Sequence, residues 1–270
     1  MRLLAALAAS VCLLAPVAPA SSSSAPAPLR VTVTTANVRN IVTASQARAD
    51  VRRAIVGSSV VLLQEMWHRR VSGLVPASWG VFHPSTPVGG CRDNAIVWDR
   101  SVWRLVHAYG YRVHYVRGLV GNCVAVAILK HRGTGRLLPV IGVHTLPHVE
   151  VSGRPRPLPR VRTYHASIDR IRDRGNRVTA VRGSVLIGGD WNVDYPADRR
   201  VQARPFPWRH FHAAFDSQWG TLPRTLPTLG SRRIDGFWWS ANGTIRPIAS
   251  RTIRGTYSDH NFVRTTYALR

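Results

Sequence analysis

Residues 186–196 read "LIGGDWNVDYP" and gather two acidic residues, Asp190 and Asp194, around Asn192. Acidic residues are scarce elsewhere, because the chain has 13 Asp and Glu against 37 Lys and Arg. The apolar residues that open the stretch predict a short strand that ends at Asp190, and the glycines before it permit a tight turn. Such a concentration of negative charge in a basic chain calls for a functional explanation.

Other acids and histidines also stand at the ends of expected strands. Glu65 directly ends the apolar run "VVLLQE", and His144 ends "PVIGVH". Asp235 lies inside "RIDGFWW", and Asp259 and His260 lie in "YSDHNF" before the last expected strand. A strand end has an anchored backbone, so these side chains predict a site at one edge of a sheet structure. For Glu65 taken alone, the alternative is a surface acid.

The rest of the chain has a pattern of many short strands and few helices. Apolar or alternating runs typical of strands occupy residues 29–36, 60–63, 95–98, 124–129, 138–143, 185–187, 234–240 and 261–268. Helical spacing of apolar residues occurs at 43–57 and 160–174. This order indicates an α/β or α+β sandwich.

The formal net charge of +24 and the pI of about 11.7 narrow the choice of partners. The charge fits a polyanion, which could be nucleic acid, anionic lipid headgroups or another phosphorylated substrate. The alternative is a solvated basic surface with an arginine bias, since Lys130 is the only lysine. Charge alone does not choose among these partners.

The N-terminus predicts export. Residues 1–20 have a charged start, an apolar stretch too short to cross a bilayer and an A-x-A cleavage site, which together are typical of a signal peptide. Residues 21–29 form a Ser/Pro/Ala-rich tether, and we expect one domain over 30–270. No later run is long enough for a membrane span, so we expect a secreted, soluble monomer. In an oxidising compartment Cys91 and Cys123 would form a disulfide; the alternative is two separate buried thiols.

Several familiar sites are excluded by spacing. Ser258, Asp259 and His260 are adjacent and therefore cannot form a serine-hydrolase relay. The chain has no G-x-S-x-G nucleophile elbow and no H-E-x-x-H zinc site, and it lacks a second E-x-x-H pair for a di-iron bundle.

Six short motifs in a fixed order are far more specific than any one of them. The chain reads "TTANVRN", "VVLLQE", "IGVH", "GGDWN", "RIDG" and "YSDH" from its N-terminus to its C-terminus. This order resembles the endonuclease/exonuclease/phosphatase superfamily, the deoxyribonuclease I-like fold, from about Val31 to Leu269. The resemblance implies a four-layered α/β sandwich with two packed mixed β-sheets flanked by helices and a site at one edge of them.

The resemblance also implies roles for single residues. The catalytic or phosphate-binding positions are His260, His144, Asp190, Asn192 and Asp235, in which Asp235 orients His260. The metal-side positions are Glu65, Asp259 and Asn37, with Gln64 supporting Glu65. Their oxygen donors favour Mg²⁺, with Mn²⁺ or Ca²⁺ as alternatives. In deoxyribonuclease I a glutamate supports the residue that matches His144; here the stretch "CRDNAIVW" has only Asp93, to which we do not assign that role.

Three functions remain open on the sequence. The first is a secreted metal-dependent phosphodiesterase, an endonuclease acting on DNA or RNA. The second is an enzyme of the same fold that cleaves phospholipid or sphingolipid headgroups, and the third is a cationic polyanion-binding protein with a decayed site. Arg154, Arg156 and Arg160 follow His144 in a proline-spaced, extended segment and are expected to bind consecutive phosphates, which favours nucleic acid; the alternative is a solvated basic loop. Trp238 and Trp239 suggest strand packing rather than membrane insertion.

Overall fold

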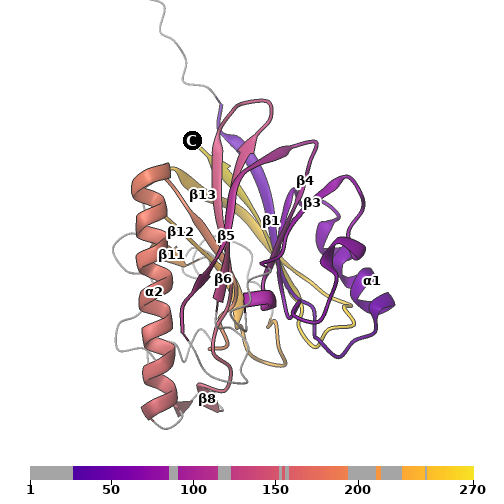
Figure 1. Cartoon of the computed structure of the whole chain (residues 1–270), viewed down its shortest axis with the longest axis vertical. Coiled ribbons are helices and arrows are strands. Elements are labelled where there is room, and N and C mark those ends of the chain that lie inside the picture. The colour runs from indigo at the N-terminus through magenta and orange to yellow at the C-terminus, as the bar shows by residue number, and fades with distance from the viewer. Residues whose placement is uncertain are drawn as a thin grey trace, which may run out of the picture.

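Two six-stranded mixed β-sheets lie face to face at the centre of the protein (Figure 1). The first sheet has the order β13 (Ile245–Ile253), β14 (Phe262–Leu269), β1 (Leu29–Asn37), β2 (Val60–Gln64), β4 (Ala95–Asp99) and β3 (Trp79–Phe82). The second has the order β11 (Phe211–Ala213), β12 (Asp235–Ser240), β10 (Leu186–Asp190), β7 (Leu137–His144), β6 (Cys123–His131) and β5 (Trp103–Arg112). A small ribbon pairs β8 (Glu150–Val151) with β9 (Arg154–Pro155).

The structure is a computed structural model that describes residues 27–84, 91–114, 123–151, 154–155, 158–193, 211–213, 227–240 and 242–270. The expected signal peptide, most of the tether, Asp194 and Arg156 lie outside these residues. In the described part of the chain, neither α-helix has the length and apolarity that crossing a bilayer requires.

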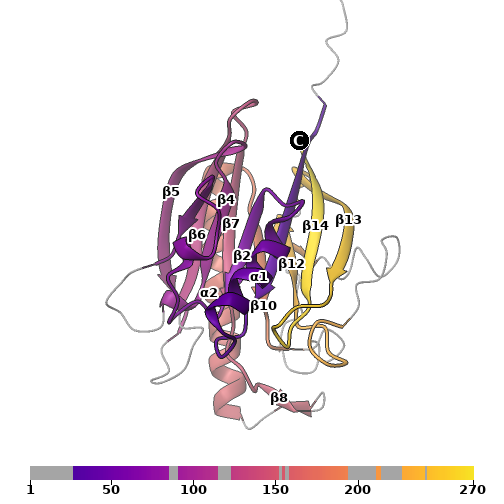
Figure 2. The same ribbon diagram turned by 90° about the vertical axis from the view of Figure 1, so that its right-hand side faces the viewer.

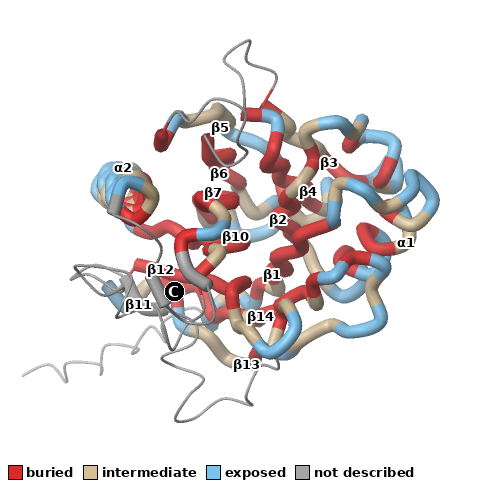
Figure 3. Tube along the Cα trace, turned by 90° about the horizontal axis from the view of Figure 1, so that it is seen from below, coloured by how far each residue is buried: buried red, intermediate tan, exposed pale blue. Residues whose placement is uncertain are grey.

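A helix covers the outer face of each sheet, which gives four layers. Helix α1 (Ala44–Ile55) packs on the first sheet and α2 (Leu158–Arg182) on the second, as the two perpendicular views show (Figures 1 and 2). Seen from below, the buried strands fill the space between the two helices (Figure 3). The four-layered sandwich expected from the sequence is therefore confirmed.

The apolar runs are continuous because the central strands are covered on both sides. In β2, Leu62 packs between the sheets while Leu63 packs toward α1. In β10, Leu186 joins the core between the sheets and Ile187 the core under α2. Trp238 and Trp239 alternate in the same way in β12 and are 5% and 3% exposed, so both are strand-packing residues as expected.

Helix α2 is longer than the sequence analysis predicted. It begins at Leu158 rather than 160, because Pro159 is compatible with the first turn of a helix, where its missing N–H has no partner to lose. It continues past the predicted end at 174, because Gly175 lies on the buried face and Val178 extends the apolar stripe of Tyr164 and Ile171. Gly183, with φ 80°, follows the last helical residue.

Strands at the sheet edges escaped the sequence analysis. These are β3, β5, β8, β9, β11 and β13. In β5, positions 104–107 are all exposed, and β13 alternates only weakly. An edge strand that is half covered lacks both the apolar run and the clear alternation on which strand prediction depends.

Two parallel pairs position the polar strand ends. Strand β1 runs parallel to β2 with Asn37 opposite Gln64, and β7 runs parallel to β10 with His144 opposite Asp190. Parallel neighbours end at the same edge of a sheet, so each pair places its last side chains together. Both edges lie at the end of the sandwich opposite the C-terminus marked in Figure 1.

A disulfide joins Cys91 to Cys123 and closes a loop of sequence separation 32. Cys91 opens the short 3₁₀ turn η2 (Cys91–Asp93), and Cys123 is the first residue of β6. The side-chain amide of Asn94 also donates a hydrogen bond to the carbonyl oxygen of Cys123 at 2.9 Å. The bond and the amide together fix η2 against the second sheet.

We expect the Cys91→Ser/Cys123→Ser protein to lose about 3–4 kcal/mol of unfolding free energy, because the open loop regains chain entropy when it unfolds. Urea denaturation of the purified protein measures the loss. Wild-type protein kept in reductant is the control and should match the double variant. Two free thiols in the mass spectrum of non-reduced wild-type protein would contradict the assignment.

Candidate active site

The carboxylate of Asp190 is the centre of the site. Asp190 ends β10 and is 1% exposed. Its Oδ2 accepts a hydrogen bond from Asn37 Nδ2 at 3.0 Å and lies 3.4 Å from His144 Nε2 and 3.9 Å from His260 Nε2. Asn37 and His260 come from the first sheet and Asp190 and His144 from the second, so the site lies where the two sheets meet.

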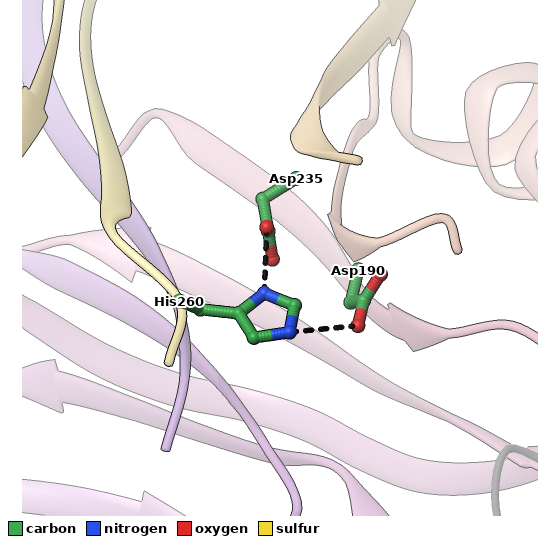
Figure 4. Close-up of side chains that lie close together, drawn as sticks. All are labelled: Asp190, Asp235 and His260. Carbon is green, nitrogen blue, oxygen red and sulfur yellow. Dashed lines mark hydrogen bonds and ion pairs between the residues drawn. The ribbon is translucent and has the colours of Figure 1, made fainter. Parts of the chain in front are cut away.

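The Nδ1 atom of each histidine contacts a second aspartate. His260 Nδ1 lies 2.8 Å from Asp235 Oδ2, at the start of β12, and Figure 4 shows the ring between Asp235 and Asp190. His144 Nδ1 lies 2.7 Å from Asp93 Oδ2. An aspartate at Nδ1 fixes the ring and places the other nitrogen toward Asp190.

The contact of His144 with Asp93 corrects the sequence analysis, which did not give Asp93 that role. An aspartate is one methylene shorter than the glutamate of deoxyribonuclease I. It still reaches the ring, because η2 brings its backbone close to the end of β7 and the disulfide holds η2 there. The signal was present in the sequence, since Asp93 is the only acid in "CRDNAIVW" ahead of the strand.

The pKa of both histidines is raised. Burial by itself lowers the pKa of His144, but the charge and hydrogen bond of Asp93, with Asp190 and Glu65 nearby, raise it to about 10. Burial also opposes protonation of His260, yet Asp235, followed by Asp190 and Asp259, raises its pKa to about 9. At neutral pH, without a cation, both rings are therefore protonated and their Nε2 atoms are donors.

The glycines before Asp190 serve close packing in the strand rather than a turn. A side chain at Gly189 would overlap the carbonyl oxygen of Val143, and one at Gly188 would overlap the ring of Phe237. The turn itself is made by Asn192, which has φ 55° and donates its backbone N–H to Asp190 Oδ1 at 2.8 Å. Asparagine tolerates this left-handed conformation better than most residues.

Glu65 directly follows β2 in a left-handed conformation, with φ 63°. Its Oε2 accepts the backbone N–H of Asn40 at 2.8 Å. The guanidinium of Arg69 secures that loop, because its Nη2 donates to the carbonyl oxygens of Arg39, Asn40 and Val42 at 3.0, 3.0 and 2.9 Å. Arg69 thereby positions the carboxylate of Glu65 through the backbone that binds it.

The residues present fit a divalent cation. Asn37 Oδ1 is buried and has no hydrogen-bond partner, although the Nδ2 of the same amide is bound to Asp190. Asn37 lies opposite Gln64, the residue before Glu65, and an unpaired buried carbonyl oxygen with a carboxylate is a donor set of the kind that hard cations take. Asp259 is placed differently: its side chain is 41% exposed and pairs with Arg39 at 3.4 Å, so it lies at the rim.

Asp190, Asp235 and His260 also have ligand atoms within 4.8 Å of one another, the one such group found among the described residues. Asp235 and His260 are bonded to each other, however, and a nitrogen donor suits magnesium poorly. We therefore assign this group to hydrogen bonding and the cation to Glu65 and Asn37. Gln64 accepts a hydrogen bond from Thr35 Oγ1 at 3.2 Å, and its expected support of Glu65 stays a prediction.

A buried acid on α1 fixes the loop that carries His260. Asp50 is fully buried and accepts the backbone N–H groups of Tyr257 and Ser258, both at 2.9 Å. Ser258 Oγ in turn donates to the carbonyl oxygen of Asn37 at 2.7 Å and accepts the N–H of His260 at 3.2 Å. Asp50 was not among the residues predicted from the sequence, although an acid next to Val51 on the apolar face of the helix is a usable signal.

The expected substrate-binding arginines are only partly described. Arg160 lies in the first turn of α2, not in an extended segment, and its Nε donates to the carbonyl oxygen of Pro147 at 2.9 Å. Arg154 belongs to β9, and Arg156 lies outside the described residues. Phosphate binding by this segment stays a prediction.

We expect Asp93→Asn to destabilise the protein in EDTA by about 3 kcal/mol at pH 6, because it leaves the buried imidazolium of His144 without its nearest anion. The raised pKa of His144 adds to the unfolding free energy of the wild-type protein. This contribution is complete below pH 6.5, the pKa of the unfolded state, and is lost as the pH rises through about 10, the pKa of the folded state. The difference in unfolding free energy between wild type and variant should therefore become smaller from pH 6 to pH 10. Urea denaturation at several pH values measures it, with Asp169→Asn on α2 as the control. An equal gap at every pH would disprove the assignment.

We expect Asp50→Asn to lower the unfolding free energy by about 2 kcal/mol, since an amide oxygen replaces a charge that accepts two buried N–H groups. The variant should also lose kcat on a phosphodiester while still folded, because the His260 loop shifts. Denaturation and kinetics under conditions where the variant is fully folded separate the two effects. Asp173→Asn, an exposed acid, is the control, and full kcat in folded Asp50→Asn would refute the positioning role.

The chain was compared with protein-family models and with curated proteins. The family model described as "Endonuclease/Exonuclease/phosphatase family" matches residues 24–260. No curated protein matches the chain.

Solved structures of the same fold cover nearly the whole chain. A humanised D. rerio TDP2 is 15% identical, with a TM-score of 0.67, over 88% of this chain and 98% of its own. An endonuclease/exonuclease/phosphatase family protein from Bacteroides thetaiotaomicron is 15% identical, with a TM-score of 0.65, over 90% and 99%. The human Nocturnin catalytic domain is 12% identical, with a TM-score of 0.62, over 90% and 96%. At these identities the likeness shows the fold alone, whereas the family model covers most of the chain. The chain therefore belongs to the endonuclease/exonuclease/phosphatase family of metal-dependent phosphoric-ester hydrolases.

Proposed function

We propose that the protein is a secreted, divalent-metal-dependent phosphodiesterase that hydrolyses nucleic acid as an endonuclease. The observation that carries the proposal is the convergence of two aspartate-backed histidines on the Asp190 carboxylate, beside the unpaired oxygen of Asn37. Hydrolysis of a phosphodiester needs an oriented water, neutralisation of charge on the phosphoryl oxygens and a proton for the leaving oxygen.

The side chains can supply these needs from their observed places. Asp190 accepts a hydrogen bond from the attacking water and takes up its proton. The Nε2–H groups of His144 and His260 donate to phosphoryl oxygens, and one of them gives its proton to the leaving oxygen. We assign His260 to polarising the phosphate, because Asp235 holds its Nδ1 and leaves Nε2 facing the site.

Glu65 and Asn37 would hold the cation, with Asp259 at the rim able to bind it through water. A cation held there, Mg²⁺ by the chemistry of these donors, would supply neutralisation of the charge on the phosphoryl oxygens. Arg69 and the loop at Asn40 keep Glu65 in place for this task.

Nucleic acid is the substrate class that the charge supports best. The net charge of +24 favours a polyanion over a single headgroup. A D. rerio TDP2 of this fold has been solved with a single-strand DNA product, which supports the same class here. Lipid headgroups are the weaker candidate, because Trp238 and Trp239 are buried and cannot insert into a membrane. The complete polar set counts against a decayed binding protein.

Secretion is part of the proposal. It rests on the signal-like residues 1–20 and is in keeping with the Cys91–Cys123 bond, which persists in oxidising compartments. Relaxation of supercoiled plasmid by the purified mature protein tests the endonuclease activity, because a closed circle has no end for an exonuclease. RNA and sphingomyelin are the parallel substrates, each with and without EDTA. Cleavage of sphingomyelin alone would replace the proposal with the lipid alternative.

We expect Glu65→Gln and His260→Ala each to lower plasmid cleavage by about 10²- to 10⁴-fold while the protein stays folded. The first removes the main carboxylate for the cation and the second a donor to the phosphate. Initial rates with Mg²⁺, alongside circular dichroism, measure the effect. Asp169→Asn is the control for loss of an acid outside the site. Wild-type turnover by either folded variant would reject the site assignment.

A further inference from the structure

A cationic cavity is lined by residues that lie close in sequence to Glu65 and Asp93. Its volume is about 590 Å³, within the range of ligand sites, and its walls include Trp67, His68, Arg70, His83 and Arg92. None of the described residues that line it is acidic. We call it the Trp67 pocket.

The Trp67 pocket is tied to the catalytic residues through the backbone. Trp67 follows Glu65 by two positions, a span of at most about 7 Å, and Arg92 directly precedes Asp93. The backbone N–H of Met66 donates to the carbonyl oxygen of Asp93 at 2.9 Å, which joins the two segments. The walls of the pocket are therefore within two residues of Glu65 and one residue of Asp93, a separation that one nucleotide can span.

The basic side chains of the pocket differ in whether they can bind an anionic ligand. Arg69 also lines it, but its guanidinium is bound to the three carbonyl oxygens of the Asn40 loop. Arg70 and Arg92 are exposed, as is His68. Burial lowers the pKa of His83, and its Nε2 lies 2.6 Å from the carbonyl oxygen of Arg92. This ring is therefore held in place and lines the pocket without offering a positive charge. Arg70 and Arg92 are thus the groups placed to bind an anion.

The pocket also offers flat rings. The rings of Trp67 and His68 lie 4.1 Å apart, centroid to centroid, at an interplanar angle of 31°. Rings combined with guanidinium groups are the means by which proteins bind single-stranded nucleic acid, with bases stacked on the rings and phosphates on the cations. A choline headgroup carries a fixed positive charge, which arginines repel. In a duplex the base faces are covered by their neighbours, so they are not free to stack here.

We propose that the Trp67 pocket binds the nucleotide next to the cleaved phosphate in a single-stranded nucleic acid. Trp67 stacks on the base, and Arg70 and Arg92 bind the flanking phosphate. This inference rests on the proposed function and adds to it a preference for unpaired strands over duplex.

Binding is measured with a fluorescent single-stranded 8-mer and a duplex of the same sequence, in EDTA to prevent cleavage. Trp67→Ala should weaken single-strand binding about 5- to 150-fold, the equivalent of 1–3 kcal/mol for one stacked base. Trp67→Phe should restore most of it, and Arg70→Ala/Arg92→Ala should weaken it and reduce its dependence on salt. Arg246→Ala, an exposed arginine at the opposite end of the sandwich, is the control and should bind as wild type.

Kinetics separate the pocket from the catalytic centre. Trp67→Ala should lower the ratio of kcat/KM for the 8-mer to kcat/KM for bis(4-nitrophenyl) phosphate at least tenfold. An equal loss of kcat/KM on both substrates would mean that Trp67 only supports the Glu65 segment. Unchanged affinity of Trp67→Ala for the 8-mer would also contradict nucleotide binding by the pocket. Wild-type protein that hydrolyses the small diester but cleaves neither DNA nor RNA would overturn the proposed function, and the pocket with it.

Discussion

The rest of the structure depends on how the buried carboxylate of Asp190 is compensated. A buried carboxylate is costly unless hydrogen bonds and opposite charges surround it. The compensating groups arrive from both sheets: Asn37 and His260 from the first, and His144 and the N–H of Asn192 from the second. Their convergence requires the two sheets to face each other with these strand ends aligned, so the packing that buries the core also assembles the site. A shift of one strand by one residue would turn its side chain to the opposite face and leave the carboxylate without a partner.

The buried charges of the site form a row in which aspartates and histidines alternate, so each charge is stabilised by its neighbours. Asp93, His144, Asp190, His260 and Asp235 follow one another in space, and each histidine lies between two aspartates. Mutual attraction along this row outweighs the effect of burial and raises the pKa of both rings. With both rings protonated, the row carries one net negative charge. A cation bound at Glu65 and Asn37 would therefore meet an environment that favours it, and it would in turn lower the pKa of the histidines toward the range in which protons move readily at neutral pH.

Strand ends and motif order were sufficient to predict the four layers and the side chains that the structure brings together around Asp190. Runs such as "VVLLQE" predict a central strand and its last acid together, because a strand covered on both faces has to be apolar throughout. Asp93 and Asp50 could not be found in the same way. Their partners lie 51 and 208 positions away in the sequence, and only the packing of η2 and α1 on the sheets brings them together. The edge strand β5 and the full length of α2 escaped for a related reason, since partial burial weakens the hydrophobic pattern that defines their limits.

The net charge of the chain favours a polyanion, but only the arginines close to the site can bind the phosphates of a substrate there. Charges on the surface are screened within about 8–10 Å at moderate ionic strength, so most of the arginines cannot act on a phosphate in the site. Among those close to it, Arg39 pairs with Asp259 and Arg69 is bound to backbone carbonyl oxygens. Arg70 and Arg92 remain exposed beside the aromatic wall of the Trp67 pocket. Selectivity for a polyanion would then arise from two guanidinium groups next to the reacting phosphate rather than from the overall charge. The remaining arginines would chiefly raise the rate at which an anionic substrate is captured, in a manner that salt suppresses.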